Sequence, residues 1–164
     1  MSDAYTADAR RLTLAGARKI ADTAAAAARK AGIAVSIAVV DAGGHPIVLE
    51  RMDGGRFHTV HSATTKAVSA ASNRRATGAR GAQGQALDTN HVVGLTLAAG
   101  AERWTAMEGG CPVIVAGECI GGVGVAGGDW KTDESIAQEA VESIGAAAQP
   151  YFAAKARRLS CERV

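Results

Sequence analysis

Two histidines, His58 and His61, combine a residue type and a spacing that could carry out chemistry. In a helix, residues three positions apart share one face, so both imidazoles could approach the same ligand. Imidazole can ligate iron, act as an acid or base near neutral pH, or bind a divalent metal. We therefore place a candidate catalytic or ligand-binding site here, and a solvated helix start is the alternative interpretation.

Charged residues near the histidines in the sequence could complete such a site. Arg51 could bind a ligand carboxylate through a bidentate hydrogen bond, and Lys66, about one turn beyond His61, could supply a second cation. A closed metal site needs three or four ligands, so His58 and His61 would require further ligands. Ordinary ion pairs or solvent contacts are the alternatives for both cations. The carboxylates that could serve as partner acids or metal ligands are Asp53, Glu50, Asp133 and Glu134.

The glycine-rich segment 122–128 invites several interpretations. Its G-x-G-x-x-G spacing matches a dinucleotide fingerprint, which we reject because the first two glycines lie within a predicted strand and not in a strand-to-helix turn. The alternating glycines give that strand a smooth face, which a helix, a neighbouring subunit or a flat ligand could cover. Gly127 and Gly128 precede a predicted helix, where backbone N–H groups could bind an anion. A tight turn before a capped helix is the alternative.

Composition limits the size of the fold and the classes of partner. The 164 residues are enough for one domain, predicted at 1–150 and followed by a polar tail at 151–164. The formal net charge is +2, from 18 basic and 16 acidic residues, so nucleic-acid binding is not expected. We also expect neither a signal peptide nor a membrane-spanning segment, because no apolar run is long enough.

The three cysteines are too few for a disulfide framework. Cys111 and Cys119 lie on either side of a predicted turn at 116–118. Cross-strand partners around that turn have residue numbers that sum to about 233–235, whereas 111 and 119 sum to 230. The two thiols are therefore predicted to be out of register, and free cysteines are typical of a reducing cytoplasm.

Hydrophobic periodicity predicts the elements that position these residues. Helices are predicted at 7–31 with Thr6 as N-cap, at 58–75, at 87–99 with Asp88 or Thr89 as cap, and at 133–148 with Thr132 as cap. Strands are predicted at 33–41, 46–52, 112–116 and 119–126, and their short connections indicate antiparallel hairpins. This order indicates an α/β (α+β) layered fold with helices packed on an antiparallel sheet.

Six short motifs together resemble those of one protein family over about residues 10–148. They are VVDAGG at 39–44, RMDG at 51–54, KA at 66–67, GGCPV at 109–113, IGGVGVAGG at 120–128 and DESIA at 133–137. Their order and spacing are similar to those of the GlcG/HbpS-like family of haem-binding proteins, which also forms the C-terminal domain of some PduO-type corrinoid adenosyltransferases. The segment 57–61 departs from the usual pattern of this family, so the resemblance assigns no haem ligand.

The resemblance implies a profilin-like layered fold with an antiparallel sheet of about five strands. It also implies homo-oligomers and, in several members, binding of haem or a related tetrapyrrole. It does not imply a single activity, because the family is functionally mixed. The profilin-like type of fold, the number of strands and the oligomer are therefore expectations that come from the family, whereas the roles of individual residues come from their chemistry.

Three functions follow as hypotheses. In the first, an oligomeric cytoplasmic protein binds a small-molecule ligand, most simply haem. Smooth strand faces would hold the macrocycle, and Arg51 and Lys66 would bind its propionates. His58 or His61 would approach the iron. In the second, an enzyme performs acid/base chemistry on a small organic acid or aromatic intermediate, with the same histidines as general base and a divalent metal as an alternative cofactor. In the third, the chain is an assembly module without a ligand.

Overall fold

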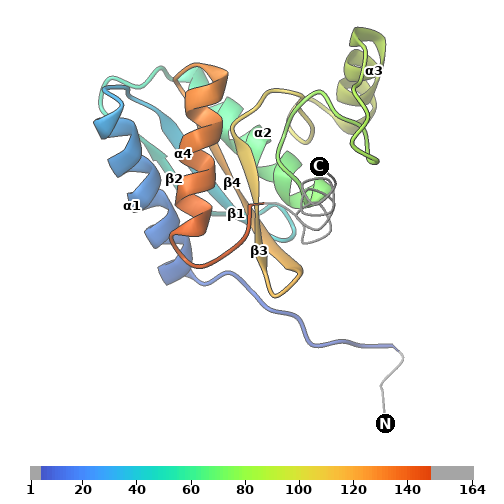
Figure 1. Ribbon diagram of the computed structural model, residues 1–164, viewed down its shortest axis with the longest axis horizontal. Helices are drawn as coiled ribbons and strands as arrows, with labels where there is room; N and C mark the ends of the chain where they lie inside the picture. Colours follow the sequence, from blue (N-terminus) through green and yellow to red (C-terminus); the bar gives the residue numbers. More distant parts are fainter. Residues whose placement is uncertain (1–4, 149–164) are drawn as a thin grey trace, which may run out of the picture.

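A computed structural model describes residues 5–148 of the chain (Figure 1). Strands and helices alternate much as the hydrophobic pattern predicts, and the predicted tail at 151–164 lies outside the described residues. Among the described helices, none combines the length and the apolar character that crossing a bilayer requires. The elements, in chain order, are α1 (Leu14–Lys30), β1 (Ser36–Asp41), β2 (Pro46–Arg51), α2 (His58–Asn73), α3 (Thr89–Ala99), β3 (Gly110–Val115), β4 (Glu118–Ala126) and α4 (Trp130–Glu142).

The sheet of the described chain is antiparallel, with the strand order β2-β1-β4-β3. It therefore has four strands where the family resemblance predicts about five, while the α+β class is confirmed. Strands β2 and β3 form its two edges, and Ile114 of β3 exchanges backbone hydrogen bonds with Ala147. The central strand β1 pairs with both β2 and β4, so its register fixes which loops meet at each end of the sheet.

Helices cover both faces of this sheet. Helices α1 and α4 pack on one face, against large side chains such as Ile37 and Val39 of β1 and Val123 of β4. Helix α2 packs on the other face, against small or short side chains such as Ala38 and Val40. Figure 1 shows α1 and α4 in front of the sheet with α2 behind it. The alternation of large and small residues in the predicted strands thus creates a three-layer α/β/α arrangement.

The smooth face of β4 is covered by helix α2. A Cβ atom added at Gly124 would lie far inside van der Waals contact of the carbonyl oxygen of Ala63, and one at Gly122 would do the same at Ala67. The glycines therefore let the helix backbone approach the sheet. Of the three predicted occupants of this face, the helix is the one present, so the expectation that these glycines hold a flat macrocycle is wrong.

Helix α1 begins later than predicted. Its N-cap is Thr13, whose Oγ1 accepts a hydrogen bond from the backbone N–H of Gly16 at 3.1 Å, instead of Thr6. The residues before it do not continue the helix, and the backbone N–H of Arg10 donates to the carboxylate of Glu118 at 3.0 Å. The alanine-rich pattern predicts a longer helix because it does not reveal this competing contact.

Helix α4 begins earlier than predicted and ends earlier. Asp129, not Thr132, caps it, because the Asp129 carboxylate accepts hydrogen bonds from the N–H groups of Lys131 and Thr132. The helix ends at Glu142 instead of Ala148, and Gly145 then adopts a φ of 73°. The chain turns back there and joins the edge of β3.

The second hairpin follows its prediction closely. Ala116 and Gly117 form its turn with φ values of 51° and 82°, as a two-residue hairpin requires. Cys111 pairs with Val123, and Cys119 pairs with Ile114. The two cysteines are therefore out of register and free, as predicted.

Candidate functional site

The register of the sheet gathers most of the predicted site residues at one end of the fold. Ser36 at the start of β1 pairs with Arg51 at the end of β2 and with Ala126 at the end of β4. Asp53 follows Arg51, and Gly127 follows Ala126. Residues far apart in the sequence thus leave the sheet side by side, at the end that is uppermost in Figure 1.

The beginning of α2 is fixed to this end by hydrogen bonds. The Thr59 hydroxyl forms a buried hydrogen bond of 2.8 Å with the Ser36 hydroxyl. The guanidinium of Arg56 donates from Nη2 to the carbonyl of Gly127 at 3.1 Å, which joins the start of α2 to the loop before α4. The predicted histidines are therefore held next to the end of β4, although their own side chains point away from the core.

Both predicted histidines are exposed on the first turns of α2. His58 and His61 are each exposed, and the ring of Phe57 meets that of His58 edge-on with 5.9 Å between centroids. Phe57 itself is 81% exposed, which is unusual for a phenylalanine. Arg51 and Asp53 are also exposed, so imidazole, aromatic and charged groups are all accessible here.

A second exposed aromatic residue lies at the start of α4. Trp130 is 55% exposed, and the Nζ of Lys131 lies 5.1 Å from the centroid of its ring. The chain has only six aromatic residues, and the rings of Phe57 and Trp130 are both exposed at this end of the fold. Sequence reasoning did not single out Trp130 or Arg56, and no pattern in the sequence predicts which aromatic side chains remain outside the core.

The predicted anion site at Gly127 and Gly128 already has internal partners. The N–H of Gly128 donates to Oδ1 of Asp133 at 2.9 Å, and the carbonyl of Gly127 accepts from Arg56. The hydrogen bonds that Asp129 accepts from Thr132 hold the pKa of that carboxyl below its usual value, so it stays charged at the helix start. An external anion would have to displace a carboxylate here, and the capped helix is the interpretation that fits.

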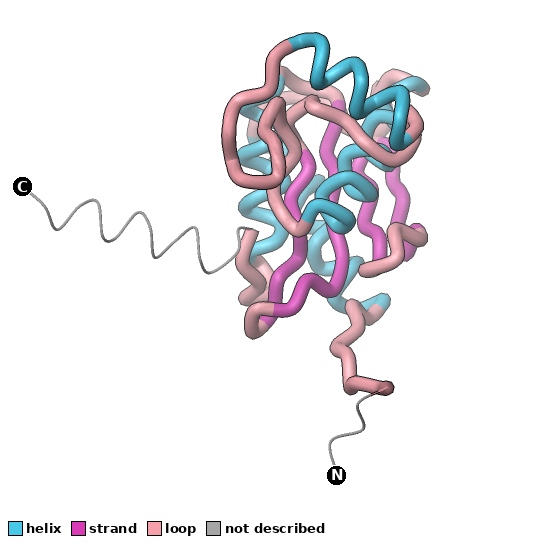
Figure 2. Tube along the Cα trace, turned by 90° about the vertical axis from the view of Figure 1, so that its right-hand side faces the viewer, coloured by secondary structure: helices cyan, strands magenta, loops and turns pink. Residues whose placement is uncertain are grey.

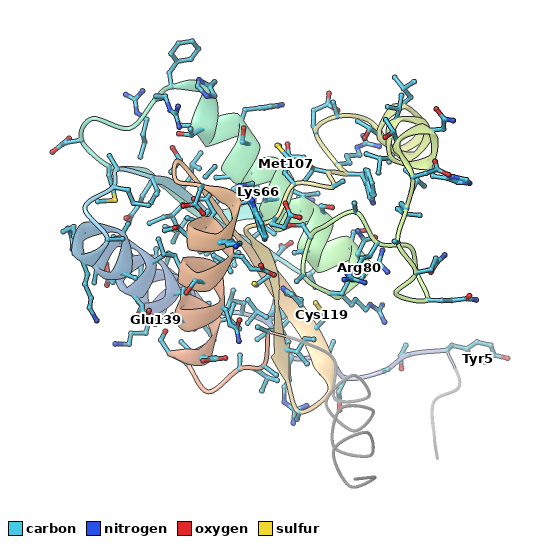
Figure 3. The ribbon with its side chains drawn as sticks, turned by 45° about the horizontal axis from the view of Figure 1, so that its top comes forward. Tyr5, Lys66, Arg80, Met107, Cys119 and Glu139 are labelled. Carbon is cyan, nitrogen blue, oxygen red and sulfur yellow. The ribbon has the colours of Figure 1, made fainter. Side chains whose placement is uncertain are left out.

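Lys66 is buried, and its ammonium group has protein partners. Its Nζ donates to Oδ2 of Asp133 at 3.0 Å and to the carbonyl of Val125 at 2.8 Å. Figure 3 shows Lys66 extending from α2 into the interior toward α4. Gly109 leaves room for this passage, because a Cβ added there would lie 3.0 Å from Nζ and 2.8 Å from the Asp133 Cβ. Lys66 thus ties α2 to α4, and a ligand propionate could reach it only by displacing Asp133.

The predicted metal ligands do not assemble into a closed site. Glu134 is partly buried near the start of α4, whereas His58 and His61 are exposed on α2. Within residues 5–148, no group of three or more His, Cys, Asp or Glu side chains could hold a metal ion. The described residues therefore do not fit a structural divalent metal, which needs such a group.

A cavity of about 330 Å³ lies at the opposite end of the sheet, near the β1–β2 turn. Its apolar lining includes Leu12, Ile47 and Ile120, and Arg11 and Asp41 border it. Hydrogen bonds from the backbone of His45 and Gly43 lower the pKa of Asp41, so the turn itself satisfies that carboxylate. None of the predicted site residues lines this cavity.

Cys111 provides a test of how tightly the core is closed. Burial in an apolar environment, with the charges of Glu134 and Glu142 as smaller contributions, raises the pKa of its thiol to about 12. Only about one thiol in 10⁴ is then ionised at pH 8, so alkylation by iodoacetamide in the native protein should be negligible. Peptide mass spectrometry before and after unfolding in urea measures this. Fast labelling of Cys111 in the native protein would contradict the packing described.

The comparisons with known proteins agree with this fold. The family model described as "Haem degrading protein HbpS-like" matches residues 12–142. An uncharacterized 15.0 kDa protein from the dhaT-dhaS intergenic region of Citrobacter freundii is 32% identical over 131 residues, which are 80% of this chain and 90% of the relative. Protein GlcG of Escherichia coli K12 is 41% identical over 98 residues, which are 60% of this chain and 68% of GlcG.

Solved structures share the architecture. Klebsiella pneumoniae protein ORFY matches with a TM-score of 0.75 at 32% identity, covering 86% of this chain and 95% of that chain. HbpS matches with a TM-score of 0.69 at 31% identity, covering 88% and 96%. PduOC, solved as a haem complex, matches with a TM-score of 0.73 at 24% identity, covering 85% and 99%, and this last likeness concerns the fold alone. The profile, the relatives and the layered fold together show that this chain belongs to the HbpS-like family, to which GlcG is also related.

Proposed function

We propose that this protein binds haem or a related tetrapyrrole at the end of the fold where α2 and α4 begin. The observation that carries the proposal is the accessible pair His58 and His61, beside the exposed ring of Phe57 and at the same end as Arg51. Membership of a family described by haem chemistry supports the same ligand class. The proposal does not use Lys66 or the glycine face of β4, because both are occupied within the fold.

The residues at this end fit the chemistry of a flat, anionic iron macrocycle. His58 or His61 would supply an imidazole nitrogen as axial ligand. Phe57 and Trp130 would pack against the macrocycle, because aromatic rings stack on flat apolar groups. The guanidinium of Arg51 would bind a propionate by charge-assisted hydrogen bonds. Bound haem would supply a redox-active iron, whose reactivity these residues would set through ligation and solvent access.

Haemin titration tests the proposal. We expect the native protein to give a shifted Soret band at micromolar haemin, and the variant His58→Ala/His61→Ala to bind about tenfold or more weakly, because the axial ligand is lost. Both side chains are exposed, so the variant should keep its fold, which circular dichroism checks.

The matched control is His45→Ala/His91→Ala, which removes the other two histidines of the chain. Those rings are exposed too, but they contact Asp41 and Asp88 away from the proposed site. The control should bind haemin like the native protein. Absence of a spectral shift with the native protein would overturn the ligand, and equal binding by both double variants would overturn the site.

Acid/base catalysis by the same histidines remains the alternative prediction from the sequence. A catalytic imidazole is normally oriented by a hydrogen bond that its ring N–H donates to a third group, such as a carboxylate. Among the described residues, carboxylates orient His45 and His91 in this way but do not orient His58 or His61. A general base at His58 or His61 would therefore act without an orienting carboxylate from the described residues.

Two further features belong to the proposal. The free cysteines Cys111 and Cys119 support a reducing compartment, and we propose the cytoplasm. We also propose that the protein is a homo-oligomer. An apolar surface that remains uncovered in one copy, described next, supports this assembly.

A further inference from the structure

After a polar first turn, helix α3 consists mainly of valine, leucine, alanine and glycine, yet none of its residues is buried. Residues 89–101 contain no Asp, Glu, Lys or Arg. Val93 is 50% exposed, Leu95 is 40% exposed and Leu97 is 79% exposed. Exposed apolar surface of this kind marks a contact with other protein or with lipid. The exposure of α3 in a single copy therefore indicates an occupant that covers it.

The helix is held in place as a defined projection. Asp88 caps its start by accepting a hydrogen bond from the N–H of His91. At its end, the N–H of Gly100 donates a hydrogen bond to the carbonyl of Thr96. The segment that follows α3 is anchored on α2, where the Thr65 hydroxyl donates to the carbonyl of Ala101 at 3.4 Å. Figure 1 shows α3 standing away from the three layers, and Figure 2 shows it at the upper edge of the molecule.

The charge pattern of α3 favours a second copy over other occupants. A two-fold contact brings a surface against itself, so any charge at its centre would face a like charge. The neutral surface of α3 avoids that repulsion. Helices that lie on a membrane surface instead carry lysine or arginine on a polar face, and residues 89–101 have neither. A strongly charged protein partner would likewise find no complementary charge on this helix.

The size of the helix indicates how far the contact extends. With 11 residues, α3 is about 16 Å long and about 10 Å wide. One face of such a helix falls short of the roughly 800 Å² that each partner buries in a stable dimer. The contact must therefore continue onto neighbouring residues, and Met107, which is 50% exposed after α3, provides further apolar surface. Met107 lies in the segment that joins α3 to β3, and Figure 3 shows it close to α2.

We propose that α3 docks against α3 of a second copy of this chain, and that the segment through Met107 completes the interface. The inference rests on the proposed homo-oligomer and names its contact surface. The neutral, apolar outer side of α3, with Gly94 and Ala98 between larger side chains, lets the two helices approach closely. The arrangement covers the one described helix that has no buried residue of its own.

Charge substitutions at Leu97 test the interface. The native chain should have a mass by light scattering of at least twice 16.6 kDa. The variants Leu97→Glu and Leu97→Lys should each form a smaller species than the native oligomer, because two like charges would then be buried in the interface. An equimolar mixture of the two variants should recover the larger species, because opposite charges now meet across the two-fold axis. Leu97 is 79% exposed, so neither change should unfold a single copy.

The matched control is Leu14→Glu, which places the same charge on an exposed leucine at the start of α1 and should keep the native mass. A native mass of 16.6 kDa would overturn the homo-oligomer and this interface together. A native oligomer that both Leu97 variants leave intact would overturn α3 as the contact surface alone. Failure of the mixture to recover the larger species would overturn the pairing of α3 with itself. Haemin binding is measured separately, so none of these outcomes depends on it.

Discussion

Replacing Lys66 by methionine is expected to lower the free energy of unfolding by about 3 to 5 kcal/mol, the range found when one partner of a buried ion pair is removed. The side chains of Lys66 and Asp133 are only 6% and 4% exposed. Methionine fills a similar volume but leaves the Asp133 carboxylate buried without its cation, and it also removes the donor to the Val125 carbonyl. Equilibrium unfolding in urea, followed by circular dichroism, measures the loss.

The double variant Lys66→Met/Asp133→Leu separates the ion pair from simple packing. Removing both charges leaves no uncompensated ion, so the double variant should recover part of the stability that the single variant loses. Gly128 then loses its acceptor on Asp133, which keeps the recovery incomplete. A loss below about 1 kcal/mol for Lys66→Met would mean that water reaches the pair and that the tie between α2 and α4 is weak.

Substitution of Gly124 by alanine is expected to cost about 3 kcal/mol or more, the upper part of the range for overpacked cores. The new methyl group would collide with the backbone of α2 at Ala63 and Ala67, so the helix would have to move away from the sheet. Backbone atoms cannot rotate aside as a flexible side chain can. Thermal and urea unfolding of the variant measure the effect.

Gly78→Ala is the matched control for this prediction. A Cβ at Gly78 meets nothing within 4 Å, and its φ lies outside the left-handed region. The same change of chemistry should therefore alter stability by less than about 1 kcal/mol. Equal losses for the two variants would show that glycine flexibility, and not the close approach of α2 to β4, explains the effect at Gly124.

Local features of the fold could be predicted from the sequence because they depend on neighbouring residues. The alternation of large and small residues in β1 predicts one face that a helix can approach closely, and α2 packs there. The turn predicted at 116–118 already places the two cysteines out of register, although the observed turn has two residues. Asp88 was one of two predicted caps of α3, and it is the one observed. In each case a spacing of a few residues carries the information.

Other features depended on contacts between distant segments and could not be predicted. Thr132 and Asp129 are both good capping residues, and the observed cap depends on where the chain leaves β4. Lys66 was predicted to be a cation that binds a ligand. Its actual partner, Asp133, is 67 residues away, so no local pattern in the sequence reveals the ion pair. The placement of His58 and His61 on a helical face was expected, but the exposure of the Phe57 and Trp130 rings depends on how the layers are assembled.

The two edges of the sheet have a consequence for how copies can associate. Edge strand β2 begins with Pro46, and edge strand β3 contains Pro112. Proline has no N–H to offer an incoming strand, so each edge resists the addition of a further strand and the growth of fibrils. The part of β3 near Ile114 is additionally covered by Ala147. Sheet extension between copies is thus disfavoured at both borders, so the proposed contact between copies would use side-chain surfaces on the helices.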